Sequence, residues 1–399
     1  MLYIYIRQYV IKYQGEYALI YLDHAATTPI PKAVADTMYE VLLHQFANPS
    51  AQYQAGVEMN RQIERWRACI AAALDGDPDR LYFTSCGTEG DSWAISAACW
   101  QNRHKGKQIV TTAVEHSAVL EACKRMEEAG YSVVRVAPNQ DGSISAQAVL
   151  DAVTPETALV SVMLVNNELG NRYPVEEIAR GLREKNPNAL LHTDAVQGFL
   201  KVPFSARTIG ADLITISAHK IGGPKGIGAL YIGPRLKHPR AWLPGGGQEK
   251  GLRSGTEATA QIAGFARAVE LRRAAFAQTY AHLEQIRAYA IERLTAIPDC
   301  LIIGDSSDNV APHILAAALV GWPSQNVVSD LSAQGICISA GSACHKGKPS
   351  HVIAALRLDK RTEKSVIRLS FGPETTEAEI DAFAAALQRH HDERFPMLA

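Results

Sequence analysis

Two polar residues that close apolar runs could together hold a cofactor with a reactive carbonyl group. Lys220 closes the run DLITISAHK, behind Ser217 and His219 and ahead of a glycine-rich stretch. Lysine forms Schiff bases with carbonyl cofactors, and glycines let the backbone approach a bulky ligand. Asp194 closes the run ALLHTD, 26 residues before Lys220, and Gln197 lies three residues further on. A buried carboxylate needs a cation or a donor, so Asp194 could bind a protonated pyridine nitrogen while Gln197 bonds a phenolic oxygen.

A third run predicts a place for a phosphate group. LYFTSCGTEGDSWAI is typical of a strand, a short turn and a helix that begins near Gly87 and Thr88. Free N–H groups and the dipole at a helix N-terminus favour a phosphate there. Each of these residues also has a structural interpretation. A lysine at a strand end is usually a surface residue, while Asp194 and Thr88 could simply cap helices.

Two more candidates follow apolar runs. His116 comes after IVTTAVE, where an imidazole ring could stack on a flat cofactor and also move a proton. Asn167 closes ALVSVMLVN in the same way. The alternatives are a structural histidine and an ordinary turn.

A cysteine and an arginine complete the chemical candidates. Cys344 lies in the polar loop SAGSACHKGKPSHV beside His345, Lys346 and Lys348. Nearby cations lower the pKa of a thiol, so Cys344 is either a reactive thiolate or a small buried residue. Arg368 lies in the apolar run SVIRLSFGP, where a guanidinium needs an anion. It either binds a substrate carboxylate or forms a structural salt bridge.

The elements that must position these residues alternate along the chain. Apolar, β-branched runs alternate with amphipathic stretches from about residue 80 to 235, which predicts an α/β domain with a mostly parallel sheet. Ligands of such sheets gather at the carboxyl ends of the strands. A long helical stretch over about 258–296 then leads to the runs LIIGD, HILAAAL and SVIRLSF and the helical TEAEIDAFAAALQRHH. This second part predicts a smaller α+β domain.

Composition excludes several classes of protein. The 399 residues are 47% hydrophobic and 20% charged, as in globular domains, and the net charge of -1 gives no signal for nucleic acid or an anionic membrane. No apolar run reaches the roughly 18 residues of a membrane helix. Arg7 and Lys12 interrupt the first twenty residues, so we expect a strand or an extension there, not a signal peptide, and a cytoplasmic protein. Seven cysteines without a C-x-x-C pair argue against a disulfide framework and a structural zinc, and no metal is expected.

These segments resemble cysteine desulfurases of the NifS/IscS type, in the class V aminotransferase group of fold-type I pyridoxal-phosphate enzymes. The resemblance runs from YLDHAATTPIP to TTEAEID and rests on TSCGTE, VEHSAVLE, VNNELG, HTDAVQ, SAHKIGGPKGIGALY, PGGGQEKGLRSGTE and SAGSAC. It implies a large domain over 33–275, with a mostly parallel mixed sheet flanked by helices. A small α+β domain from 21–32 and 276–399 would carry the Cys344 loop and Arg368, after an N-terminal extension over 1–20.

The resemblance also implies residue roles. Lys220, Cys344 and His116 would be catalytic, and Arg368 and Asn167 would bind the substrate. Family members are homodimers, in which the partner subunit's Thr256 would complete the phosphate site. Pyridoxal 5'-phosphate would be held by Gly87, Thr88, His116, Asn167, Asp194, Gln197, Ser217, His219, Lys220 and Thr256.

The implied reaction converts L-cysteine to L-alanine and leaves the sulfur as a persulfide on Cys344. A sulfur-acceptor protein, as in iron–sulfur cluster assembly or tRNA thiolation, would then collect it. The alternative is a selenocysteine lyase or another class V aminotransferase-type enzyme. The sequence departs from the family pattern in two places, and the first of them leaves the acceptor open. The loop after Cys344 is about two residues shorter, with Lys348 where the family has Glu, and Tyr53 stands where the family has His.

Overall fold

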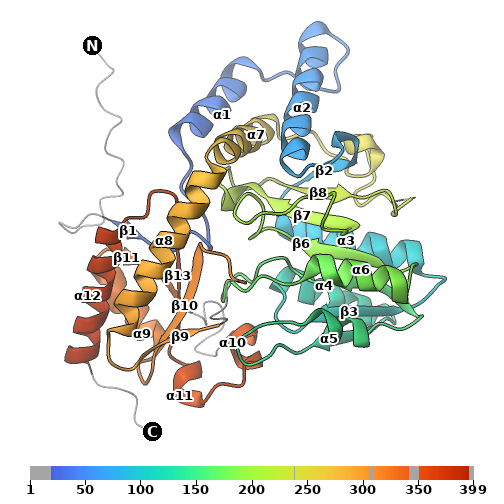
Figure 1. The fold of residues 1–399 in the computed structure, drawn as a ribbon. Helices are drawn as coiled ribbons and strands as arrows, with labels where there is room; N and C mark the ends of the chain where they lie inside the picture. The colour runs from blue at the N-terminus through green and yellow to red at the C-terminus, as the bar shows by residue number, and fades with distance from the viewer. Residues whose placement is uncertain (1–18, 238, 305–308, 341–349, 395–399) are drawn as a thin grey trace, which may run out of the picture.

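The computed structural model describes residues 19–237, 239–304, 309–340 and 350–394 (Figure 1). Most of the predicted site lies within these ranges. Cys344 and the charged residues that follow it, His345, Lys346 and Lys348, lie outside the described residues.

A seven-stranded sheet forms the larger layer of the fold. Its strand order is β2-β8-β7-β6-β5-β3-β4, and all neighbours pair in parallel except those of β8, which runs antiparallel to β7 and β2. The predicted α/β class with a mixed, mostly parallel sheet is therefore confirmed. The strands are β2 (Leu81–Thr84), β3 (Gln108–Thr112), β4 (Ser132–Val136), β5 (Thr157–Ser161), β6 (Leu190–Asp194), β7 (Leu213–Ser217) and β8 (Gly228–Ile232).

Helices bury both faces of this sheet, which explains why its strands read as continuous apolar runs. Neighbouring strand residues point to opposite faces. Leu190 packs in a core with residues of α3 and α4, whereas Leu191 packs in a core with residues of α2, α6 and α7. The helices of this unit are α1 (Lys32–His44), α2 (Gln54–Ala73), α3 (Gly87–Asn102), α4 (Ser117–Glu128), α5 (Ala146–Asp151), α6 (Val175–Lys185) and α7 (Thr259–Ala274).

A second unit is built on a smaller antiparallel sheet of order β12-β13-β10-β9, beside the large sheet in Figure 1. The long helical stretch divides at Ala275 into α7 and α8, and α8 packs on the second unit against α12. Near the N-terminus, β1 pairs in parallel with β11, and Leu22 joins the second unit's core. The elements are β1 (Ile20–Tyr21), α8 (Phe276–Thr295), β9 (Cys300–Ile303), β10 (Ile314–Leu319), α9 (Ser324–Ala333), β11 (Ile336–Cys337), β12 (Ser339–Ala340), α10 (His351–Ala355), α11 (Lys360–Glu363), β13 (Val366–Ser370) and α12 (Glu377–Glu393). Within the described ranges, no helix is both long and apolar enough to cross a membrane.

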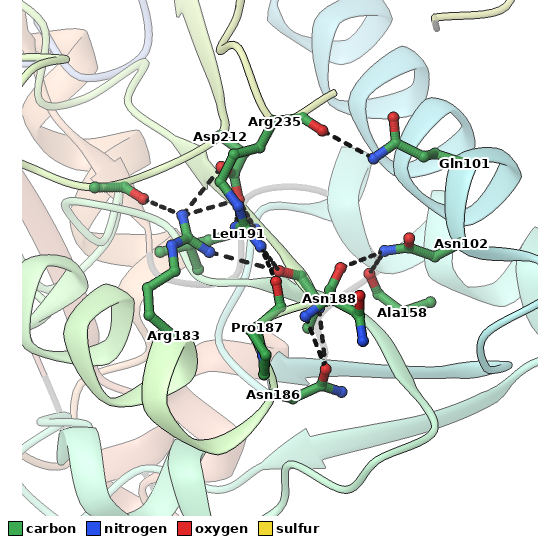
Figure 2. Close-up of polar contacts among 12 residues, drawn as sticks. Gln101, Asn102, Ala158, Arg183, Asn186, Pro187, Asn188, Leu191, Asp212 and Arg235 are labelled. Carbon is green, nitrogen blue, oxygen red and sulfur yellow. Dashed lines mark hydrogen bonds and ion pairs between the residues drawn. The ribbon is translucent and has the colours of Figure 1, made fainter. Parts of the chain in front are cut away.

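A buried carboxylate holds the amino-terminal edge of the large sheet together (Figure 2). Asp212, just before β7, accepts hydrogen bonds from Arg183 at 3.0 and 3.1 Å, from Arg235 at 2.9 Å and from the Leu191 N–H at 2.8 Å. Asn102 of α3 donates to the Ala158 carbonyl at 2.8 Å in the same region. These bonds hold the amino-terminal ends of the strands in place. They therefore help to position the carboxyl ends of the same strands, where the predicted site lies.

Removing the Asp212 carboxylate should destabilise the protein strongly. Asp212→Ala removes the carboxylate that pairs with two guanidinium groups and leaves a buried N–H without its acceptor, so we expect a loss of about 3 kcal/mol in the free energy of unfolding. Urea unfolding followed by circular dichroism measures this. Arg207→Ala is the control, because it cuts the exposed Arg207–Asp75 pair (2.8 Å) and should cost less than about 1 kcal/mol. Equal losses in the two variants would contradict this account of the edge.

Candidate active site

The predicted site residues converge at the carboxyl edge of the large sheet. Asp194 is the last residue of β6, and Ser217 is the last of β7. A short 3-10 helix, Ala218–Lys220, follows β7 directly. Since β6 and β7 are parallel neighbours, their ends must lie side by side.

Lys220 is held against the segment that follows β1. Its Nζ donates to the carbonyl oxygens of Ala25 at 2.6 Å and Ala26 at 2.8 Å. Burial and, after it, the nearby Arg368 lower the pKa of Lys220 from 10.5 to about 8, although Asp194 and Asp23 act in the opposite direction. The amine is therefore a usable nucleophile close to neutral pH.

Asp194 is a buried carboxylate with no ion-pair partner among the described residues. It accepts a hydrogen bond from the Val196 N–H at 2.8 Å. Burial and, after it, the carboxylate of Asp91 on α3 raise the pKa of Asp194 to about 7. One ligand atom each of Asp91, His116 and Asp194 lie within 4.8 Å of one another. Two carboxylates and an imidazole suit either a protonated heterocycle or a divalent cation.

His116 caps α4 and turns an exposed ring toward the site. Its Nδ1 accepts a hydrogen bond from the Ala118 N–H at 3.1 Å, so the proton of the neutral ring lies on Nε2. Loss of solvation lowers the pKa of His116, and Lys220 lowers it further, while Asp194 opposes the change. A neutral ring with one open face can stack on a flat ligand.

The start of α3 provides an anion site beside Ser217. The first N–H groups of a helix have no partners within it. The Ser217 hydroxyl is buried and makes no hydrogen bond in the described chain. A Cβ on Gly87 would lie 3.9 Å from the Ser217 Cβ and only 2.9 Å from Val196, so this corner needs glycine. Thr88 is exposed next to it.

Two other predicted phosphate and ring ligands lie around Lys220. His219 forms a hydrogen bond with the Thr27 hydroxyl at 3.3 Å, and its pKa is lowered to about 4 by burial and by Lys220. The Gln197 amide donates to the Ala25 carbonyl at 2.9 Å, the oxygen that Lys220 also contacts. Gln197 and Lys220 therefore converge on one atom.

Arg368 of β13 reaches across from the second unit to Asn167. It donates to the Asn167 carbonyl at 2.9 Å, and it forms a salt bridge with Asp23 at 2.7 Å. The salt bridge that the sequence left open as an alternative is thus present. Yet the Arg368 Nε and the Asn167 Oδ1 are buried without a hydrogen-bond partner in the described chain. The guanidinium keeps donor capacity for a further anion.

Both ends of the segment that contains position 344 are fixed beside the site. Ser339 of β12 pairs with Arg368. After the segment, the Ser350 hydroxyl donates to Glu168 at 2.5 Å, and His351 bonds the Glu115 carbonyl at 2.8 Å. The chain on either side of Cys344 is therefore tied to the neighbours of Asn167 and His116.

Thr256 is exposed, and no hydrogen bond joins it to the other site residues within the described ranges. Its loop is anchored by two ion pairs, Arg67–Glu249 at 2.7 Å and Arg253–Glu89 at 2.9 Å. The loop is thus held rigidly while Thr256 faces outward.

Sequence reasoning missed three acids of the site, of which Asp91 and Glu115 are buried and Glu168 is partly buried. Asp91 stands out among the small residues of α3, a signal that could have been read. Glu115 accepts hydrogen bonds from Thr112 at 2.7 Å and from the Met163 N–H, and burial raises its pKa to about 8. Glu168 could not be found, because its partner Ser350 is 182 residues away in the chain.

Comparisons with known proteins match nearly the whole chain. The family model for class-V aminotransferases matches residues 20–383. A cysteine desulfurase of Nostoc sp. is 38% identical over 367 residues, which cover 91% of this chain and 90% of that protein. A solved NifS-like protein has a TM-score of 0.88 at 32% identity, covering 94% of this chain and all of that one. The structure of SspA in complex with cysteine has a TM-score of 0.76 at 31% identity, covering 89% and 99%.

The lowered pKa of Lys220 predicts an unusual labelling profile. In protein free of small ligands, reductive methylation of Lys220 by formaldehyde and cyanoborohydride should rise with pH around a midpoint near 8, since only the neutral amine reacts. Peptide mass spectrometry at each pH gives the profile, with surface lysines, ordinarily near 10.4, as the internal reference. A Lys220 midpoint near 10.4 would contradict the proposed environment.

Proposed function

This chain belongs to the class-V aminotransferase family, and from that premise we propose that it is a pyridoxal-phosphate-dependent cysteine desulfurase. The proposal depends on one observation above all. Lys220, with a pKa near 8, lies at the same sheet edge as Asp194, a buried carboxylate that lacks a cation among the described residues. A lysine that reacts with aldehydes and a carboxylate that needs a cation are the two groups that this cofactor requires.

The residues fit pyridoxal 5'-phosphate at each of its polar ends. The buried Ser217 hydroxyl lacks a partner at the open N-terminus of α3, which suits the phosphate. Asp194 would hold the ring nitrogen, Gln197 the ring hydroxyl, and Lys220 the aldehyde carbon. Gly87, Thr88, His219 and Asn167 would complete the contacts of one subunit.

Bound pyridoxal phosphate supplies an electron sink that makes the α-proton of an amino acid acidic. The residues of this chain do the rest. Arg368 and Asn167 bind the carboxylate of L-cysteine and orient its Cα. The neutral Nζ of Lys220 accepts the proton from Cα, and His116 assists proton transfer beside the ring.

The sulfur of the substrate is transferred to Cys344. Its thiolate forms a bond to the substrate sulfur while the substrate Cβ–S bond breaks, and the electron pair of that bond stays with carbon, which gains a proton. L-Cysteine and the thiol thus become L-alanine and a persulfide on Cys344. A sulfur-acceptor protein, such as a scaffold for iron–sulfur cluster assembly or a tRNA-thiolation enzyme, then takes the sulfur. We also propose that the protein works in the cytoplasm. A persulfide forms on a free thiol, which a reducing compartment preserves, and the described cysteines are free.

We further propose the domain division that the sequence predicted, with a large domain over 33–275 and a small one from 21–32 and 276–399. Two observations support it. Leu22 packs in the core of the second unit, and the helical stretch breaks at Ala275, after which α8 packs in the same core. Residues 1–20 remain an N-terminal extension by this proposal.

An exposed apolar surface supports a homodimer. Of the 11 large hydrophobic residues exposed in the described chain, seven lie between residues 30 and 57, and Phe46 is 80% exposed. Tyr39, Leu42 and Leu43 are exposed on α1, just before Phe46 in the sequence. This helix packs on α7 at the top of Figure 1. A second copy would cover this surface, and the partner subunit's Thr256 would complete the phosphate site.

Replacing the proposed nucleophile tests the reaction. Cys344→Ser should retain the visible absorbance of bound cofactor while alanine and sulfide formation from cysteine fall at least about a hundredfold. Cys337→Ser is the control, because burial raises the pKa of that thiol and leaves it unreactive. Alanine formation by Cys344→Ser at the wild-type rate would overturn the assignment. A 2-oxo acid without alanine or sulfide would instead indicate transamination.

Charging the exposed surface formed by α1 and by Phe46, which follows this helix, tests the dimer. Leu42→Glu with Phe46→Glu should halve the mass measured by light scattering and weaken cofactor binding at least about tenfold, because each site loses a ligand from its partner. Leu301→Glu, on the exposed side of β9, should change neither. A dimer that survives the double substitution would refute this interface.

A further inference from the structure

A small cavity lies behind Lys220, between the large sheet and the second unit. Its volume is about 20 Å³, and its walls are largely apolar side chains of α8 and of the segment after β13. Four basic side chains other than Lys220 line it: His24, Lys201, Arg272 and His313. No Asp or Glu is among the described residues that line it. Several basic side chains around one cavity without an acidic partner are rare in a protein interior.

The cations around this cavity repel one another. Burial lowers the pKa of Lys201 well below 10.5, and Lys220 and Arg272 lower it further. Burial also lowers the pKa of Arg272, and Glu374, which does not line the cavity, acts in the opposite direction. Among the residues that the structure describes, Lys201 has one acceptor, the Gln197 side chain at 3.1 Å, and Arg272 donates its Nε to the Ile221 carbonyl at 3.0 Å. Their remaining N–H groups can serve another acceptor.

Two buried histidines add donors that lack acceptors in the described chain. His313 is 1% exposed, and neither ring nitrogen has a hydrogen-bond partner. The Nδ1 of His24 is also without one. The His24 ring lies close against Gly372, where a Cβ would come within 2.2 Å of it, and the Tyr21 ring packs on it with the two centroids 5.0 Å apart. A neutral imidazole always carries one N–H, and burying it unpaired is unfavourable.

We propose that this cavity binds a small monovalent inorganic anion of the halide class. Lys201 and Arg272 supply the charge, and the ring N–H groups of His313 and His24 supply directed hydrogen bonds. A volume of about 20 Å³ is a little more than one water needs, so it admits a single ion and excludes sulfate or phosphate. The proposal rests on these contacts alone and does not depend on the proposed function.

The anion would also act on the neighbouring active site. It would favour the charged form of Lys201, whose ammonium donates to the Gln197 side chain at 3.1 Å. Through Gln197 and its shared contact at Ala25, this orders the segment against which Lys220 rests.

Bromide is the direct probe. Crystals of the full-length protein loaded with pyridoxal phosphate should be soaked in sodium bromide, and data collected at the bromine absorption edge. We expect an anomalous peak in the cavity within hydrogen-bond distance of Lys201 and a ring nitrogen of His313. Bromide peaks at surface sites with none in this cavity would overturn the proposal.

Thermal unfolding gives an independent test in solution. At equal ionic strength, potassium chloride should raise the unfolding midpoint above that in potassium gluconate by at least about 2 °C. Lys201→Met should abolish this difference, while Lys364→Met, which replaces an exposed lysine of the second unit, should retain it. A chloride effect of equal size in both variants would show ordinary salt screening and contradict the site. Should Lys201→Met fail to fold, the bromide map of the wild-type protein still decides.

Discussion

The carboxylate of Asp194 is buried at the end of β6 without a cation beside it among the described residues. The chemistry of the proposed site depends on this buried carboxylate. Its pKa is raised to about 7, because burial and the nearby Asp91 both disfavour its charge. A group in this state stabilises whatever cation arrives next to it. The parallel sheet makes the arrangement possible, since it brings the end of β7, with Ser217 and Lys220, next to the end of β6.

Charge is distributed unevenly on the two sides of Lys220. On one side lie the buried acids Asp91, Glu115 and Asp194, and on the other lie Lys201 and Arg272. Lys220 stands at the boundary between them, and its pKa near 8 reflects burial together with opposing fields. The acidic side suits a protonated ring, and the basic side suits an anion. Both preferences arise from side chains that the fold forces out of water.

The sequence predicted the residues whose position follows from local pattern. Lys220, Asp194 and His116 each follow a β-branched apolar run, and such runs end at one edge in a parallel sheet. The α/β class followed from the same alternation. Contacts between distant segments could not be found this way. Asp23 meets Arg368 across 345 residues, and Ser350 meets Glu168 across 182, with nothing in either local sequence to indicate the pairing. Buried acids such as Glu115 were missed because a strand end gives no sign of what packs above it.

We propose above all that Lys220 is the residue that binds the cofactor aldehyde. Incubating the protein with pyridoxal phosphate, reducing it with borohydride and mapping the peptides by mass spectrometry tests this directly. We predict one stably modified lysine, in the peptide that contains Lys220. Modification of Lys201 or of surface lysines instead, with Lys220 unmodified, would contradict the account.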